Sequence, residues 1–388
     1  MKHRILHSAP LLPLAICMIA GIIVQQWLCL SFPLLPFFLI FVVLSFVLRR
    51  WRHLQSIAIS LSFMLLGAYT LQLSNNNDHS DHSPAPIVVK AQEWRSYLLR
   101  NFQNLQADDD EYAVLAAMTL GDKSAMTRET RELYSKTGAS HVLALSGLHL
   151  GIIYMLLIYL MPGRRKWWGR LLLVLSIWAF ALLTGLSNSI IRSATMISIY
   201  AVFSLRAGRQ SSVNVLAFAA LVMLLINPHT LFDIGFQMSF MAVLAILLIM
   251  PLTEHFVSEE YLQSHPLLKW LWGTVAVSTA AQIGVSPLIA YYFGRFSTYF
   301  LLTNLIVIPA VTVILYGSLL FFISSWTAIG MGVLWIVTML NRVLEWTARL
   351  PMASIDGLHP SAFQVVLIYV VFAALYLFLV KLRPIAKD

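Results

Sequence analysis

The chain has 388 residues, of which 59% are hydrophobic and 11% charged, and its formal net charge at pH 7 is +9. Soluble globular domains carry about a quarter of charged residues, so this composition excludes them. Apolar residues form continuous runs long enough to cross a membrane as helices, whereas barrel strands would alternate polar and apolar residues. We therefore predict an all-α, polytopic helical integral membrane protein.

The positive net charge is not evidence for nucleic-acid binding, because it is distributed unevenly. The segment from Asn75 to Gly138 holds ten acidic and seven basic residues. The remaining basic residues gather in short loops between apolar runs, as the positive-inside rule produces in any inner-membrane protein. The two cysteines, Cys17 and Cys29, fall in the first apolar run and indicate neither a disulfide nor a metal site.

Taken in order, the apolar runs predict about 10–12 transmembrane helices. They cover residues 9–30, 34–48, 57–73, 141–161, 167–186, 190–205, 213–226, 231–250, 268–289, 299–323, 328–340 and 363–380. Basic clusters at 49–52, 164–166, 206–209 and 381–387 mark the cytoplasmic side. Both termini are then cytoplasmic, and the topology of the last third is the least determined, since Arg295 falls on the outer side.

The polar segment between the third and fourth runs is predicted to lie outside the membrane and to form short amphipathic helices. An apolar stripe from Trp94 to Leu105 recurs at helical spacing. Asp108–Asp110 supply charge for the start of a helix that ends at Gly121. His79 and His82, with neighbouring aspartates, have the spacing of metal ligands, although a polar loop explains them equally well. We predict three parts: residues 1–74, a three-helix membrane segment; 75–138, the extracytoplasmic segment; and 139–388, a membrane channel core.

The most informative stretch runs from Gly138 to Gly151, where polar residues lead directly into an apolar run. On a continuous helix, His149 and Ser146 lie about 80° and 140° from His141, and the histidines are ~12 Å apart along the axis. Such polar groups cost free energy inside a membrane unless they face water, a polar partner or a ligand. The stretch therefore predicts a pore or pocket lining, with a buried helix–helix contact as the alternative.

Further polar residues occur inside the predicted helices. Arg192 either extends toward the outer headgroups or contacts phosphate, which a guanidinium binds bidentately. Asp233 lies four residues before Gln237 and is a candidate counter-ion for Arg192. The candidate lining also includes Gln282 and Asn304, whose alternative role is hydrogen bonding between helices.

The sequence from His141 to His149 closely resembles the signature of ComEC-type competence proteins, the inner-membrane channels for DNA uptake in transformable bacteria. Further matches occur in the order typical of that family, with Ser193 replacing an alanine and Met238 a leucine. They are Ala116–Asp122, Thr184-Gly185 with Ile191–Met196, Asn227–His229 with Phe232–Phe240, and Gln282, Pro287 and Asn304–Pro309. The resemblance implies passage of single-stranded DNA into the cytoplasm during natural transformation.

The resemblance covers the membrane core only. Full-length relatives carry an OB-fold domain and a metallo-β-lactamase-like domain, but the segment from Ser74 to Ala107 is too short for an OB fold, and no His-x-His-x-Asp-His motif occurs. We expect separate proteins to act as DNA receptor, nuclease and motor, because the chain has no P-loop either. No cofactor, bound metal or enzymatic activity is expected.

Three other functions are compatible with these residues. One is a transporter of another substrate on the same scaffold, and another is a non-catalytic assembly subunit. The third is an intramembrane hydrolase with Ser146 as nucleophile and His149 as base. A helical i, i+3 pair points both side chains outward, which disfavours the hydrolase.

Overall fold

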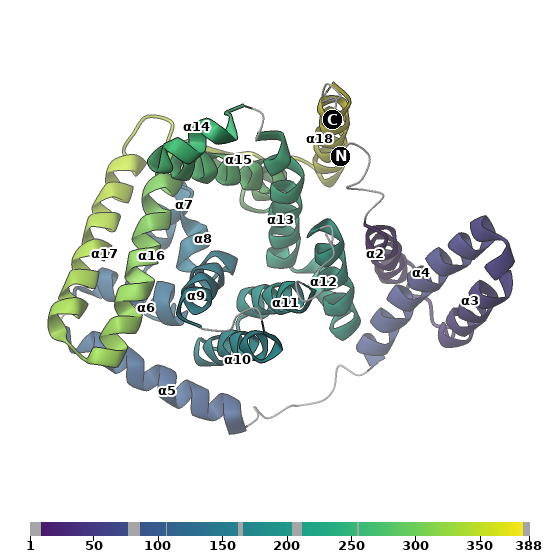
Figure 1. Ribbon diagram of the computed structural model, residues 1–388, viewed down its shortest axis with the longest axis horizontal. Coiled ribbons are helices and arrows are strands. Elements are labelled where there is room, and N and C mark those ends of the chain that lie inside the picture. Colours follow the sequence, from purple (N-terminus) through teal and green to yellow (C-terminus); the bar gives the residue numbers. More distant parts are fainter. Residues whose placement is uncertain are drawn as a thin grey trace. The chain divides into compact units, whose positions relative to one another are not determined.

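The computed structural model describes residues 9–76, 86–105, 107–161, 166–203, 212–253 and 256–382 (Figure 1). Helices dominate this part of the chain, which confirms the all-α class. They are α2 (Leu11–Leu28), α3 (Leu35–Val47), α4 (Arg52–Asn76), α5 (Pro86–Gln103), α6 (Asp109–Leu120), α7 (Arg128–Lys136), α8 (Ser140–Leu143), α9 (Gly147–Leu160), α10 (Trp167–Leu183), α11 (Asn188–Phe203), α12 (Ser212–Ile226), α13 (Ile234–Thr253), α14 (Glu259–Ser264), α15 (Pro266–Phe293), α16 (Phe300–Ser324), α17 (Thr327–Ala348) and α18 (Ala362–Leu382).

Within the described residues, 7 helices are long and apolar enough to cross a membrane, namely α2, α4, α13, α15, α16, α17 and α18. The apolar helices α9, α10 and α12 are shorter. Within the described residues, eleven of the twelve predicted apolar runs each coincide with one α-helix, and the run 141–161 is divided between α8 and α9. The chain is a multi-pass helical membrane protein. The exact number of crossings within the predicted range stays a prediction.

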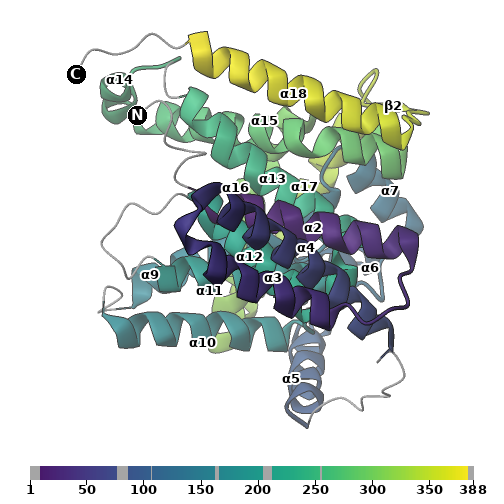
Figure 2. The same ribbon diagram turned by 90° about the vertical axis from the view of Figure 1, so that its right-hand side faces the viewer.

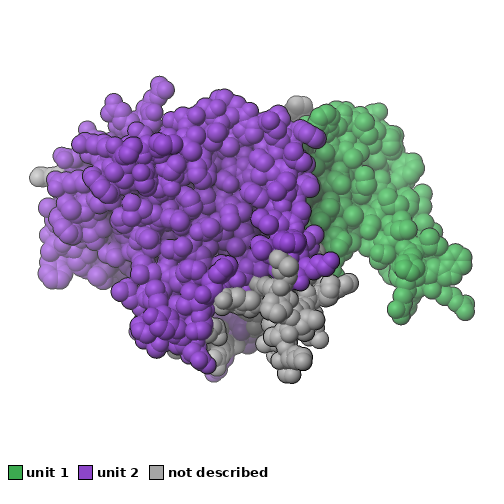
Figure 3. Space-filling view, turned by 90° about the horizontal axis from the view of Figure 1, so that it is seen from above, with its two compact units in different colours: residues 1–83, 199–240 green, residues 84–198, 241–388 purple. Residues whose placement is uncertain are grey.

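The chain folds into two compact units (Figure 3). Unit 1 comprises residues 1–83 and 199–240, and unit 2 comprises residues 84–198 and 241–388. Helices α11 and α13 each contribute to both units. The predicted three-part division stays a prediction.

Unit 1 is built on a close crossing of α2 and α4. A Cβ on Gly21 would overlap the carbonyl oxygen of Met64, and one on Gly67 would overlap that of Met18. Glycine at both positions therefore lets the two backbones touch, as small residues do in membrane helix pairs. The core against this crossing is apolar and includes Ile22, Leu71, Leu221, Leu224 and Phe236.

Unit 2 has α6 at its centre, where the sequence predicts a short helix at the outer surface. After a charged first turn, every residue from Ala113 to Leu120 is buried. Three alanines, at positions 113, 116 and 117, let α16 and α17 pack closely on this helix. The one-sided stripe expected on α5 is also only partly buried, because Phe102 is enclosed whereas Trp94 and Tyr97 remain exposed.

Helix α7 connects this core to α17. The Thr127 side chain accepts a hydrogen bond from the Thr130 backbone N–H and begins the helix. The Tyr134 hydroxyl donates to Asn341 Oδ1 at 2.7 Å, and burial raises the pKa of Tyr134. The end of α7 is held by Arg295, which bonds Asp356 in a short antiparallel pair of strands, β1 (Arg295–Ser297) and β2 (Ser354–Asp356).

Helix α18 lies beside α15 in both views (Figures 1 and 2). Pro287 removes a backbone donor from α15, and one turn earlier the Gly284 carbonyl accepts a 2.8 Å hydrogen bond from the Tyr369 hydroxyl of α18. Gly284 also brings α15 against the backbone of α13 at Met241. Pro287 and Gly284 therefore determine how α15 packs against α18 and α13 in unit 2.

Candidate functional site

The signature stretch does not form one helix, so the prediction of a continuous helix from His141 was wrong. The short helix α8 ends at Leu143, and Ala144 is extended, with φ −101° and ψ 129°. Ser146 is extended too, with φ −123° and ψ 177°, and α9 begins at Gly147. The angles predicted between His141, Ser146 and His149 on one axis therefore do not apply.

The break is stabilised by Ser146 and His149, which occupy the N-cap and N3 positions of α9. The Ser146 backbone N–H donates to His149 Nδ1 at 3.2 Å, and the Ser146 hydroxyl lies 3.1 Å from the same nitrogen. This is the reciprocal pattern of a capping box, with histidine in the place usually taken by glutamate or glutamine. His149 thus accepts a hydrogen bond from the Ser146 backbone N–H, a donor that the break in the helix would otherwise leave without a partner.

The same geometry fixes the chemistry of the His149 ring. Since Nδ1 accepts the backbone hydrogen bond, the neutral imidazole carries its proton on Nε2. The side chain is fully buried, and Nε2 has no hydrogen-bond partner among the described residues. A buried donor without a partner costs free energy, so its presence points to a ligand or water in the functional state.

The other signature histidine lies at the start of the break. His141 is exposed, and its Nδ1 lies 3.1 Å from the Gly138 carbonyl oxygen. The signature thus has one exposed and one buried histidine.

Helix α16 runs along the whole signature stretch. At one end a Cβ on Gly138 would touch Ser297 and Phe300, and at the other the Tyr316 hydroxyl donates to the Ile152 carbonyl oxygen at 3.0 Å. The α16 residues Thr303 and Asn304 fall between these anchors. Their Oγ1 and Oδ1 atoms are buried and have no hydrogen-bond partner among the described residues. Helix α16 therefore contributes two buried, uncharged polar atoms between its contacts with the two ends of the signature stretch.

Helix α11 covers the start of α9. A Cβ on Gly147 would lie 3.1 Å from Ser193 Oγ, and Ile190 and Ala194 pack with Leu145 and Leu150 around it. Arg192, beside Ser193, is 7% exposed. The structure therefore places the signature and the Ile191–Met196 segment in direct contact, with a buried guanidinium on the contacting helix.

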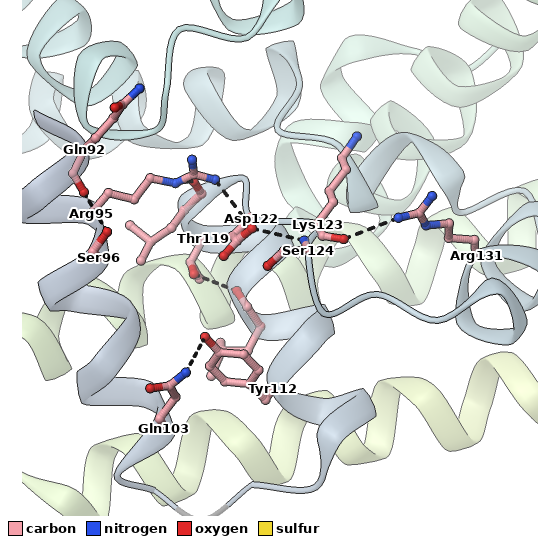
Figure 4. A network of polar contacts seen from close by, with 12 residues as sticks. Gln92, Arg95, Ser96, Gln103, Tyr112, Thr119, Asp122, Lys123, Ser124 and Arg131 are labelled. Atoms are coloured by element: carbon pink, nitrogen blue, oxygen red, sulfur yellow. Dashed lines mark hydrogen bonds and ion pairs between the residues drawn. The ribbon is translucent and has the colours of Figure 1, made fainter. Parts of the chain in front are cut away.

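A second contact joins the break to the end of α6. Gly121 has φ +72°, and a Cβ there would lie 2.7 Å from Leu145 Cδ1 and 3.2 Å from the Thr184 carbonyl oxygen. Arg95 of α5 donates from Nε to the Leu120 carbonyl at 2.9 Å and lies 4.0 Å from Asp122 (Figure 4). Three segments that resemble competence proteins therefore meet in one small region of unit 2. They are Ala116–Asp122, the signature stretch and Thr184-Gly185.

Arg95 is a residue that sequence reasoning missed. Its guanidinium fills the space beside Gly185, where a Cβ would lie 3.2 Å from Nη1. It therefore links α5 to both the α6 terminus and the turn between α10 and α11. A basic residue on an exposed amphipathic helix gives no sign of this role, and only its distant partners reveal it.

The remaining candidates are described by their own local contacts. Asp233 and Gln237 belong to unit 1, where Asp233 accepts the Phe236 N–H at 2.8 Å and Gln237 donates to the Leu231 carbonyl at 3.0 Å. The proposed Arg192–Asp233 pair stays a prediction, because the two residues lie in different units. Gln282 is half-buried on α15. The His79 and His82 segment lies outside the described residues, and within them no cluster of three metal-ligating side chains occurs.

These features define a polytopic membrane protein with a broken, histidine-capped helix inside its larger unit. The family model described as "Competence protein" matches residues 118–382. The chain therefore belongs to the Competence protein family, and the resemblance seen in the sequence is confirmed.

Individual relatives agree with this assignment. The chain is 29% identical to ComE operon protein 3 of Bacillus subtilis over 72% of its own length and 35% of the relative's. It is 27% identical to Competence protein ComA of Neisseria gonorrhoeae, over 40% of this chain and 24% of the relative. An uncharacterized Aquifex aeolicus protein is 30% identical over 51% of this chain and 45% of its own length. The chain thus spans less than half of these relatives, and no solved structure matches it.

Proposed function

We propose that the chain forms an inner-membrane channel that passes single-stranded DNA into the cytoplasm during natural transformation. Family membership and the names of two relatives, which refer to competence, support this proposal. The observation that carries it furthest is the broken helix, where segments shared with the family meet around buried polar groups. Both termini are proposed to be cytoplasmic, and separate proteins would supply the receptor, nuclease and motor.

The chemistry of the break suits a polyanion. In a membrane, the N-terminus of a half-helix presents free N–H groups and a partial positive charge, which attract anionic groups. The His149 Nε2–H adds a neutral donor, and Arg192 adds a charge that binds phosphate. A site with few fixed cations and several uncharged polar atoms binds a DNA strand weakly. The strand can then slide past the break and be released.

The test is passage of DNA through the purified protein. Proteoliposomes that contain the chain should admit fluorescent single-stranded oligothymidylate down its gradient, and duplex DNA of equal length should stay outside. Entry of another solute class without DNA would favour the transporter alternative and contradict the channel.

The hydrogen bond between Ser146 and His149 also raises the hydrolase alternative, and the expected outward orientation of the pair was wrong. The bond has a structural explanation, however, because His149 Nδ1 accepts from the Ser146 backbone as well. We expect Ser146→Ala to retain most DNA passage, since loss of an N-cap costs about 1 kcal/mol. His149→Leu should abolish passage by removing the Nε2–H donor. Equal inactivation of both properly inserted variants would instead indicate a nucleophile and base acting together.

Topology gives a further prediction. In a variant with Cys17 and Cys29 replaced by serine, a cysteine at exposed Gln92 should react with an impermeant maleimide in intact spheroplasts. A cysteine at exposed Lys166 should react only after lysis, because this residue is the last of the basic cluster 164–166 on the proposed cytoplasmic side. The reverse labelling pattern would invert the proposed orientation.

A further inference from the structure

An open cavity of about 410 Å³, lined by polar and apolar side chains, lies between α5, α6 and the loop that leads to α7. It lies wholly in unit 2, outside the apolar spans, and on the outer face in the proposed topology. Its lining is Ser96, Leu99, Arg100, Gln103, Tyr112, Asp122, Ser124 and Ala125. The close-up in Figure 4 includes much of this wall.

The wall offers an aromatic ring and an available cation. Gln103 Nε2 donates to the Tyr112 hydroxyl at 3.4 Å, which holds the ring at the cavity (Figure 4). Arg100 is exposed on the last turn of α5 and lines the same space. A tyrosine ring stacks on a nucleobase, and a guanidinium binds phosphate.

The acidic member of the wall is already compensated. Asp122 Oδ1 accepts the Ser124 N–H at 3.1 Å and lies 4.0 Å from Arg95 Nη2. Its charge therefore opposes an incoming phosphate less than a lone carboxylate would.

Positive charge is crowded beside the cavity. The Arg131 guanidinium donates to the Lys123 carbonyl oxygen at 3.3 Å (Figure 4). Partial burial, and then the charge of Arg131, lower the pKa of Lys123. An anion bound nearby would relieve this repulsion.

We propose that the cavity binds one nucleotide of single-stranded DNA, with its base on Tyr112 and its phosphate on Arg100, before the strand reaches the broken helix. This inference rests on the proposed DNA channel. The loop that lines the cavity begins at Gly121, which touches Leu145 of the break. The two sites are therefore joined by one short segment.

The experiment measures binding of fluorescent oligothymidylate to the full chain in detergent by anisotropy. Arg100→Gln and Tyr112→Leu should each weaken binding about tenfold. Arg100→Gln should also lower the slope of log affinity against log salt by about 0.7, whereas Tyr112→Leu should leave it unchanged. Tyr112→Phe keeps the ring and should bind like the wild type, which separates stacking from a general effect on folding.

Two matched controls use the same residue types outside the cavity. Arg128→Gln on α7 and Tyr97→Leu on α5 change exposed side chains and should leave affinity and slope unchanged. Wild-type affinity in both Arg100→Gln and Tyr112→Leu, or equal losses in the controls, would overturn the cavity assignment.

Passage into proteoliposomes separates this inference from the proposed channel. If the wild type passes DNA while the cavity variants bind and pass it equally well, the channel stands and the cavity assignment fails. If the wild type passes no DNA, the proposed function fails. Binding that still depends on Arg100 and Tyr112 would then keep the cavity as a nucleotide site.

Discussion

Gly121→Ala is expected to abolish DNA passage and to destabilise unit 2. A side chain in the left-handed region costs roughly 1–2 kcal/mol, and at Gly121 the new Cβ would also lie 3.2 Å from the Thr184 carbonyl oxygen. This oxygen is backbone, so the turn after α10 must shift by a few tenths of an ångström, and the end of the Leu145 side chain, whose Cδ1 would lie 2.7 Å from the new Cβ, must move as well. Passage into proteoliposomes and thermal unfolding in detergent measure the two effects.

The chain contains a matched control for this substitution. Gly357 has φ +80°, close to that of Gly121, but a Cβ there meets nothing within 4 Å. Gly357→Ala should therefore show only the conformational cost and should pass DNA normally. Equal effects of the two substitutions would mean that the contacts of Gly121 with Leu145 and Thr184 are unimportant.

The spanning helices were predictable because a membrane imposes a simple requirement. Every backbone polar group in hydrocarbon must be paired locally, so an apolar run long enough to cross becomes a helix. The position of α6 was not predictable in the same way. Its apolar turns from Ala113 are shorter than a span, and a short apolar helix gives no sign of whether it lies on a surface or in a core.

The sequence does contain a local signal for the break, but it lies inside a continuous apolar pattern that also predicts an unbroken helix. Serine followed by glycine favours a helix start, but the capping partner three residues later is His149 rather than the usual glutamate. The angular prediction failed because it assumed one continuous helix through Leu145. The convergence of Gly121, Leu145 and Thr184 depends on distant parts of the chain, which no local pattern encodes.

Arg192 offers the sharpest test of charge at the break. Only 7% of its surface is exposed, and the neighbouring Ser193 on the same helix contacts the start of α9. A charged side chain at the bilayer centre costs about 2.5–3.5 kcal/mol on insertion scales, and the cost is lower near the end of a span, where Arg192 lies on α11. Arg192→Gln removes the charge but keeps a polar side chain, and we expect it to abolish DNA passage.

Lysine at the same position separates charge from geometry. It keeps the positive charge but replaces the planar fork by a single ammonium, which cannot bind phosphate bidentately. Arg192→Lys should therefore restore passage only in part. Protein amount and insertion are compared by quantitative blotting of membranes. If Arg192→Gln passes DNA at the wild-type rate, the buried guanidinium has a structural role only, and the phosphate contact at the break must come from His149 and the α9 N-terminus.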